Sequence, residues 1–318
     1  MGKSIPIIKL NQEHISDLFK DGLKTDMVFR QIQRDTIGKS GSNPSWGYAF
    51  YNDGGKMKFS GIALHKEFDY DYPMAAYGEK VWSIFGQELL GDSVRVPKIE
   101  IVEQIPGCED IISYRILDND TEDMIHIKET LFNKFEREEI KSKKEIYTIE
   151  EILECVRMQI RNGENYKKVE KDIIQVLLLD AVTNNGDRHV LNWGLVREKE
   201  TNNYSLAVFD HASAFVDMFE DKSYFIKSGW ANTYVTVGED RGKTNIGSDG
   251  KKVIDYIAEE YPEYFNEFCD NFNEKLPKIL EEVKKEKMKI DFNRLQRKMQ
   301  ERRYYLKKVK NKGEYEYE

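Results

Sequence analysis

The sequence predicts an α+β protein, with strands concentrated in the first third of the chain and helices in the remainder. Three observations support this fold class. Asn52–Gly55 separates two apolar runs and is a strong hairpin signal, because glycine accepts positive φ in a tight turn. Helical apolar spacing dominates after residue 124. A strand pair at 193–209, joined by a hydrophilic turn, interrupts these helices.

The first third of the chain contains the patterns of two hairpins and two helices. A helix is predicted at 11–22, where Asn11 can cap the first turn, and a strand at 26–34. A second helix at 77–91 carries a buried apolar stripe and ends at Gly91. The hairpins are predicted at 46–64 and, around the Pro106–Gly107 turn, at 96–117.

The remainder of the chain is predicted to be mainly helical. A charged turn at 118–123 follows the last strand of the first part, so we expect a domain boundary at about 116, between 1–116 and 117–318. Helices are predicted at 148–160, where Thr148 is the cap, and at 165–182.

The stretch that carries chemistry begins where the apolar helix 165–182 ends. Asp187-Arg188-His189 follows a polar turn, Asn192 lies five residues after Asp187, and an apolar strand ends at Asp210. The strand pair should bring Asn192 and Asp210 side by side. An Asp that handles the acceptor hydroxyl, followed by an Asn and an Asp that hold Mg²⁺, is the layout used for phosphoryl transfer. Hard oxygen ligands of this kind suit Mg²⁺.

The segments GDRHVLN (186–192) and VFDHAS (208–213) resemble the catalytic and metal segments of the HipA-like serine/threonine kinases. They are also similar to those of the phosphatidylinositol 3-/4-kinases. The resemblance covers about residues 170–215. It implies a two-lobed kinase-like fold, with a β-rich, nucleotide-binding small lobe and a mainly helical large lobe. It also implies ATP and Mg²⁺ as cofactors, with Asn192 and Asp210 as metal ligands.

Two residues are candidates for the catalytic base. Asp187 can orient the acceptor hydroxyl or take its proton, and His189 is the alternative because histidine changes charge near neutral pH. Arg188 could contact phosphate or pair with an acidic partner. Asp180, near the end of the apolar helix, is expected to be buried and to support the catalytic loop, since a buried carboxylate needs hydrogen-bond donors.

A lysine–glutamate pair that contacts the nucleotide phosphates is expected in the first part of the chain. We assign it to Lys58, which lies between Met57 and Phe59 on the returning strand of the first hairpin, and to Glu79 in the helix that follows. The alternative is Lys66, in a segment (HKEFDYDYP) with the composition of a loop.

Two further segments are expected to border the nucleotide. The Gly- and Ser-rich stretch 37–47 is either a surface loop or a loop that covers the nucleotide, in which case Ser42 lies near the phosphates. HipA-like kinases can phosphorylate a serine in such a loop, so Ser40, Ser42 and Ser45 are candidate autophosphorylation sites. Residues 112–117 would connect the lobes, with Ile112 and Tyr114 beside the adenine.

Three functions are compatible with these residues. The first is a HipA-like protein serine/threonine kinase, which could pair with an antitoxin-type protein partner. The second is the same chemistry on a phosphoinositide or a small metabolite. The third is a non-catalytic nucleotide-binding module, which the intact Asp187, Asn192 and Asp210 set disfavours.

Composition limits the partners and the compartment. The formal net charge of −8 gives no global signature for nucleic acid or for an anionic membrane, although 275–312 is locally basic. That basic segment carries an apolar stripe and is predicted to be a surface amphipathic helix. Three dispersed cysteines, a short N-terminal apolar patch and the lack of a long apolar run predict a cytoplasmic protein with no signal peptide or membrane span.

Overall fold

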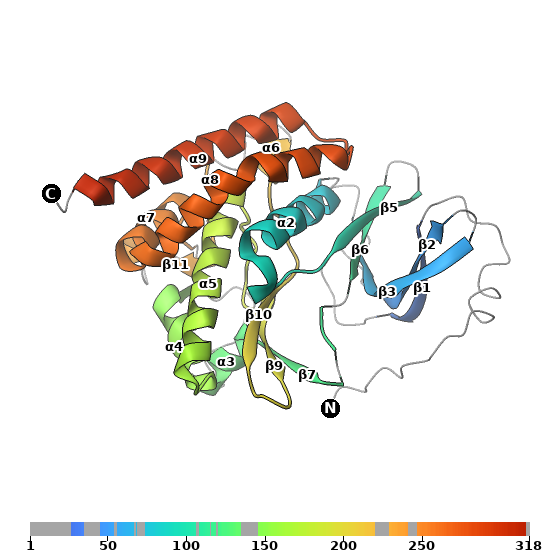
Figure 1. Cartoon of the computed structure of the whole chain (residues 1–318), viewed down its shortest axis with the longest axis horizontal. Helices are drawn as coiled ribbons and strands as arrows, with labels where there is room; N and C mark the ends of the chain where they lie inside the picture. The colour runs from blue at the N-terminus through green and yellow to red at the C-terminus, as the bar shows by residue number, and fades with distance from the viewer. Residues whose placement is uncertain are drawn as a thin grey trace.

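The structure is a computed structural model, and it describes residues 27–34, 45–53, 56–66, 68, 74–105, 108–114, 116–118, 120–134, 146–219, 229–240 and 247–315. The fold is α+β, with a sheet-rich N-terminal part and a helical C-terminal part, as the sequence predicted (Figure 1). The predicted helix at 11–22 lies outside the described residues, as do Ser40 and Ser42. The predicted domain boundary at 116 stays a prediction.

The N-terminal part is built on a five-stranded antiparallel sheet. In spatial order its strands are β1 (Met27–Arg34), β2 (Ser45–Asp53), β3 (Lys56–Lys66), β6 (Cys108–Tyr114) and β5 (Ile99–Ile105). Both predicted hairpins are confirmed, as β2–β3 and β5–β6. Residues 45–47, which we expected in the Gly- and Ser-rich loop, already belong to β2, and Ser45 pairs with His65.

The predicted loop position of Lys66 is wrong. Strand β3 runs for 11 residues and has Lys66 as its last residue. Pairing with β6 keeps the strand regular beyond the hairpin, since His65 and Lys66 lie opposite Ile112 and Ile111. Lys58 lies eight residues earlier on the same strand, so roughly 26 Å separates the two lysines along it.

Helix α2 (Ala75–Leu90) connects the two parts of the molecule (Figure 1). It packs against β5 and β6 on one side and against helices of the C-terminal part on the other. The four residues predicted for its buried stripe, Val81, Trp82, Phe85 and Leu89, are all at most 5% exposed. After α2 come a 3₁₀ turn (Gly91–Ser93) and strand β4 (Val94–Arg95), which pairs in parallel with a strand of the second sheet.

The second sheet has four strands and supports the catalytic segment. Its order is β4, β10 (Tyr204–Val208), β9 (Trp193–Glu198) and β7 (Glu122–His126). The predicted pair at 193–209 is therefore confirmed. The charged turn predicted at 118–123 is too long, because Glu122 and Asp123 already pair with Glu198 and Arg197 of β9. Strands β8 (Tyr147–Thr148) and β11 (Val235–Thr236) form a separate short parallel pair.

The helices of the C-terminal part enclose one large apolar core. They are α3 (Ile127–Lys134), α4 (Ile149–Gln159), α5 (Gly163–Thr183), α6 (Val216–Phe219), α7 (Gly250–Glu260), α8 (Pro262–Lys285) and α9 (Phe292–Tyr315). Thr148 caps α4 in a complete capping box with Glu151, as the sequence predicted. The basic segment 275–312 forms parts of two helices, α8 and α9, and not one; they pack side by side (Figure 1).

Within the described part of the chain, no helix combines the length and the apolar composition needed to cross a bilayer.

Candidate active site

The catalytic loop begins where helix α5 ends. Asn184 closes the helix in the left-handed conformation (φ 55°), which asparagine tolerates better than most residues. Asn185 then turns back, and its backbone N–H donates to the carbonyl of Asp180 at 2.9 Å. Gly186 passes close to the backbone of residue 232, since a Cβ there would lie 3.0 Å from the Asn232 carbonyl oxygen. The turn delivers Asp187 to the half-buried edge of the site.

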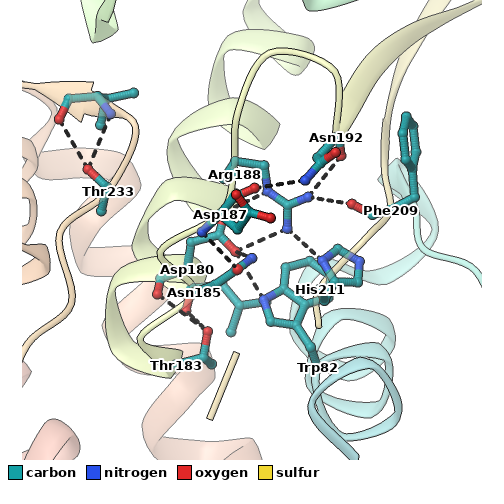
Figure 2. A network of polar contacts seen from close by, with 12 residues as sticks. Trp82, Asp180, Thr183, Asn185, Asp187, Arg188, Asn192, Phe209, His211 and Thr233 are labelled. Atoms are coloured by element: carbon teal, nitrogen blue, oxygen red, sulfur yellow. Dashed lines mark hydrogen bonds and ion pairs between the residues drawn. The ribbon is translucent and has the colours of Figure 1, made fainter. Parts of the chain in front are cut away.

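A cluster around Arg188, which we call the arginine cluster, holds this loop in place (Figure 2). It consists of Trp82, Asp180, Asn185, Arg188 and His211. Asp180 accepts hydrogen bonds from Trp82 Nε1 at 3.1 Å, from Asn185 Nδ2 at 2.7 Å and from Arg188 Nε and Nη2 at 2.8 and 3.1 Å. The predicted supporting role of Asp180 is confirmed, although most of its donors are side chains and not loop backbone.

Arg188 has no donor left for phosphate. Its Nη1 donates to the carbonyls of Asn192 at 2.9 Å and of Phe209 at 2.8 Å, and its Nη2 donates to His211 Nδ1 at 2.6 Å. With the two bonds to Asp180, all five guanidinium N–H groups are used. The side chain is 2% exposed and its guanidinium lies over the Trp82 ring. We had predicted that Arg188 either pairs with an acidic partner or contacts phosphate. The first prediction is confirmed by Asp180, and the second is wrong, because every donor is already bonded within the protein.

His211 has a structural role that the sequence did not indicate, and its imidazole is neutral. It is fully buried and stacks on Trp82, with ring centroids 3.6 Å apart. Burial, together with the charges of Arg188 and Lys66, lowers the pKa of His211 well below its usual range. Since Arg188 can only donate, Nδ1 of His211 is the acceptor, and the ring proton is assigned to Nε2.

Asn192 and Asp210 lie side by side, as the strand pair predicts. Phe209 N donates to the Asn192 carbonyl at 3.1 Å, and Arg188 Nη1 donates to the carbonyls of both Asn192 and Phe209. Asn192 Nδ2 donates to the carbonyl of Asp187 at 2.7 Å, which turns the amide oxygen away from that bond. Asp210 adopts φ 60°, and its side chain remains 40% exposed. An amide oxygen and an accessible carboxylate, close to Asp187, suit Mg²⁺.

A second group of charges, the lysine triad, consists of Lys66, Glu79 and Asp210. Lys66 Nζ lies 2.9 Å from Glu79 Oε1 and 2.5 Å from Asp210 Oδ1. We had expected Glu79 to pair with Lys58, but it pairs with Lys66, the alternative. The side chain of Lys58 lies outside those described. The loop-like composition after Lys66 concealed that β3 extends to this residue.

Glu79 also ties helix α2 to the residue after Asp210. Its Oε2 accepts from the backbone N–H of His211 at 2.8 Å. The two chain segments approach closely because Gly78 has no side chain: a Cβ there would lie 2.6 Å from the Ala214 carbonyl oxygen. Glu79 thus orients both Lys66 and the start of the segment that follows Asp210.

The electrostatics separate the roles of the acidic groups. Burial raises the pKa of Asp187, and the charge of Asp210 reinforces this effect, while His189 and Arg188 oppose it. Burial would also raise the pKa of Asp210, but the charge of Lys66 and its hydrogen bond outweigh it, so the net shift is downward. The charges of Glu79 and Asp210 likewise overcome burial and raise the pKa of Lys66. Asp210 thus stays ionised, while Asp187 is more basic than an ordinary aspartate.

His189 and Tyr234 lie beside Asp187. His189 Nδ1 accepts from Leu191 N at 3.3 Å, a bracing contact with the loop backbone. The ring of Tyr234 packs edge-on against His189 at 5.7 Å. Burial, the charge of Asp187 and a hydrogen bond to it raise the pKa of the Tyr234 hydroxyl. Tyr234 could not be predicted from the sequence, because it lies far from the motif in a segment without a recognisable pattern.

Two further predicted site residues lie on β6, an inner strand of the five-stranded sheet. Ile112 is buried in β6 opposite His65, and Tyr114 is half-buried opposite Ala63. Their contact with adenine stays a prediction. Ser42 lies outside the described residues. Among the described residues, no group of three His, Cys, Asp or Glu side chains forms a metal site by itself.

Comparison with known proteins identifies the fold. No protein-family model matches the sequence, and no curated protein is significantly similar to it. Among solved structures, the proinflammatory kinase CtkA of Helicobacter pylori is similar with a TM-score of 0.63 and 13% identity, over 89% of this chain and 95% of CtkA. The fold is that of the HipA-like kinases.

The second similar structure is HipA of Shewanella oneidensis MR-1, from a complex of the toxin–antitoxin proteins HipA and HipB with operator DNA. Its TM-score is 0.55 at 13% identity, over 98% of this chain and 76% of the HipA chain. Together the two matches establish a kinase-like fold over nearly the whole chain.

Proposed function

We propose that this chain is an ATP- and Mg²⁺-dependent phosphotransferase, and specifically a HipA-like protein serine/threonine kinase. The observation that carries the proposal is the convergence of four residues from three segments: Lys66 of β3, Asp187 and Asn192 of the catalytic loop, and Asp210 after β10. A kinase-like fold supports the same conclusion.

In the proposed reaction the acceptor hydroxyl oxygen attacks the γ-phosphorus of ATP. The bond from that phosphorus to the bridging oxygen breaks, and ADP leaves. The hydroxyl proton passes to Asp187, whose pKa is raised by burial; His189, which packs against Tyr234, is the alternative acceptor of the proton. Lys66, held by Glu79, would neutralise phosphate charge. Asn192 and Asp210 would hold Mg²⁺, which would supply further positive charge to stabilise the phosphoryl group during transfer.

The protein acceptor is favoured over the other substrates by the resemblance of the catalytic segments to the HipA-like kinases. We also propose autophosphorylation at Ser40, Ser42 or Ser45, which would add about −1.5 to −2 charges beside the phosphates and so oppose nucleotide binding. A cytoplasmic location of this chain and an antitoxin-type protein partner belong to the same proposal. The solved HipA structure contains HipB.

The decisive experiment offers radiolabelled ATP with Mg²⁺ and three acceptor classes in parallel: a protein mixture, phosphoinositide vesicles and a metabolite pool. We expect label on protein, lost in Asp187→Ala and Asp210→Ala and retained in Lys58→Met. Label on a lipid or a metabolite would show that the acceptor is not a protein, while the proposed phosphoryl transfer from ATP would still hold. Nucleotide binding by calorimetry without transfer to any acceptor would favour the non-catalytic module.

Intact-mass and peptide mass spectrometry of the same reactions tests autophosphorylation. The expected result is phosphate within residues 37–47 of the wild type and none in Asp187→Ala. Phosphate confined to other residues would refute this part of the proposal.

A further inference from the structure

We propose that Arg302, in the C-terminal helix α9, is a positioning residue for phosphoryl transfer: it holds residues 229–234 against the catalytic loop and thereby builds the acceptor side of Asp187. This inference rests on the proposed function and assigns a role to a helix that lies outside the motif. No feature of the sequence connects Arg302 with Asp187, which precedes it by 115 residues.

Arg302 contacts two separate segments at once. Its Nη2 donates to Asn184 Oδ1 at 3.1 Å and, in a shorter bond, to the Gly229 carbonyl. Its guanidinium lies flat over Trp230, with the carbon atom 3.4 Å from the ring centroid. Asn184 is the cap residue between α5 and the catalytic loop, whereas Gly229 and Trp230 belong to the segment that precedes Tyr234. The guanidinium therefore joins the loop to that segment.

Asn184 extends the connection in both directions. Its Nδ2 donates to Asp217 Oδ2 at 2.8 Å and to the Gly229 carbonyl at 3.3 Å, and its Oδ1 accepts from Ala231 N at 3.3 Å. Arg294, which lies eight residues before Arg302 on α9, donates to the Asp217 carbonyl. Through these bonds, α9 and Asn184 each contact both Asp217 and Gly229.

From Ala231 onward the backbone is hydrogen-bonded to Ser248 and to Gly250, the first residue of α7. The Ala231 carbonyl accepts from Gly250 N at 2.9 Å, and Thr233 N and Val235 O bond to Ser248 at 2.8 Å each. The hydroxyl of Thr233 makes further contacts with the carbonyls of Val235 and Ser248. Tyr234 is held between these bonds, with its ring against His189. Displacement of residues 229–231 would therefore be transmitted to Tyr234.

The energetics of Arg302 indicate a role other than stability. The residue is 5% exposed, and no carboxylate among the described residues lies within ion-pair distance of it. Burial lowers the pKa of Arg302 to about 10, against the opposing charges of Asp217 and Glu301, and its Nε has no hydrogen-bond partner in the described part of the chain. A buried cation without a close counter-ion costs free energy, which an apolar residue would avoid. What it provides is geometry: a planar group that stacks and donates simultaneously.

The test compares Arg302→Met with Arg303→Met. Arg303 is the next residue of the same helix, and its Nε donates to Asn273 of α8, away from the site. We expect kcat to fall roughly 10²-fold in Arg302→Met, as for a misplacement of about 1 Å at a reacting centre. The KM for ATP should be unchanged, because among the described residues the ion pairs of the lysine triad join Lys66, Glu79 and Asp210 to one another and not to α9. Arg303→Met should retain both parameters.

Two readouts separate positioning from general destabilisation. Amide hydrogen exchange in 229–237 should accelerate in Arg302→Met while exchange in α5 and α8 stays at the wild-type rate. In Arg302→Ala, low-millimolar guanidinium should restore kcat, since the ion can occupy the space over Trp230; the same salt should not change Arg303→Met. If Arg302 variants do not fold, Trp230→Leu removes the stacking partner at a half-buried position and should give the same exchange and kcat pattern.

The outcomes also distinguish this proposal from the proposed function. If the wild type transfers no phosphate, the proposed function fails, and exchange in 229–237 still decides whether Arg302 holds the segment. Wild-type kcat in both Arg302→Met and Trp230→Leu would overturn the positioning role alone. Uniformly faster exchange throughout the C-terminal helices would overturn it as well, because it would assign Arg302 to general stability.

Discussion

The arginine cluster and the lysine triad are adjacent, joined at Asp210 and His211, and they use charge in opposite ways. In the arginine cluster Arg188 and Asp180 are each 2% exposed, and their charges balance. In the lysine triad one cation faces two carboxylates, and Asp210 is 40% exposed. In the arginine cluster the donors of Arg188 are all bonded within the protein. The lysine triad has one more carboxylate than it has cations, and its exposed carboxylate is Asp210. The comparison teaches that burial with complete pairing fixes geometry, whereas incomplete pairing leaves capacity for a cation.

The largest effect on activity should come from Asp210→Ala. Loss of a proposed metal ligand and of a partner of Lys66 is expected to reduce phosphoryl transfer by roughly 10³-fold, the upper scale for one electrostatic stabiliser of a transition state. The free energy of unfolding should change by less than about 1 kcal/mol, because Lys66 keeps Glu79. Initial rates over a range of Mg²⁺ concentrations and urea unfolding measure the two quantities. Full activity at every Mg²⁺ concentration would remove Asp210 from the metal site.

Compared with Asp210→Ala, Asp180→Ala should have the larger effect on the free energy of unfolding and the smaller direct effect on phosphoryl transfer. It leaves the Arg188 cation buried with no carboxylate, and such a loss costs roughly 3–5 kcal/mol of folding free energy. Urea or thermal unfolding checks this value, with Asp210→Ala as the matched comparison. If the two variants unfold alike, the distinction between a structural cluster and a functional one is not valid.

Lys66→Met tests the triad from its cationic side. We expect kcat/KM to fall by roughly 10²-fold, since a charge that would face the nucleotide phosphates is lost inside a partly closed site. Lys58→Met, at the far end of β3, is the control and should retain wild-type kinetics. The opposite ranking of the two lysines would mean that the Lys66–Glu79 pair is structural.

The smallest effect concerns Asp172, a third buried carboxylate, on the same helix as Asp180. It is 2% exposed and accepts from Ser93 Oγ at 2.8 Å, but its Oδ2 has no partner among the described residues. Burial raises the pKa of Asp172 above its ordinary value, against Ser93, Lys168 and Lys171. The folded state then holds the proton to a higher pH than the unfolded state, so this group lowers stability as the pH rises from about 4 through its folded pKa.

Asp172→Asn removes that titration. The stability difference, variant minus wild type, should increase as the pH rises from about 4 and then level off, by up to about 1 kcal/mol. Urea unfolding at several pH values, with Asp180→Asn in parallel, measures this difference. A difference that shrinks with rising pH would contradict the raised pKa.

Much of the site was predictable because it depends on local order along the chain. The spacing of Asp187, Asn192 and Asp210, together with the strand pair between the last two, fixes their proximity. The Thr148 capping box and the buried stripe of α2 are equally local patterns. Such features follow from periodicity and turn chemistry, which the sequence displays directly.

The residues that were missed depend on contacts between distant elements. The extent of β3 is set by pairing with β6, so the strand continues to Lys66 through a sequence that resembles a loop. Trp82 was assigned only to the apolar stripe, yet its indole N–H binds Asp180. Tyr234 and Arg302 reach the catalytic loop from segments 47 and 115 residues beyond Asp187. No pattern within a window of sequence reports these contacts.

The bond between Glu79 and the backbone N–H of His211 has a consequence for inhibitor chemistry. A compound that requires Asp210 to swing out of the site would have to break this bond, separate the His211 ring from Trp82 and move the chain away from Gly78. Each contact adds about 1 kcal/mol or more to the energy of such a rearrangement. Ligands that fill only the nucleotide space avoid that cost, so screening against this protein should favour compact nucleotide competitors over scaffolds that extend behind the aspartate.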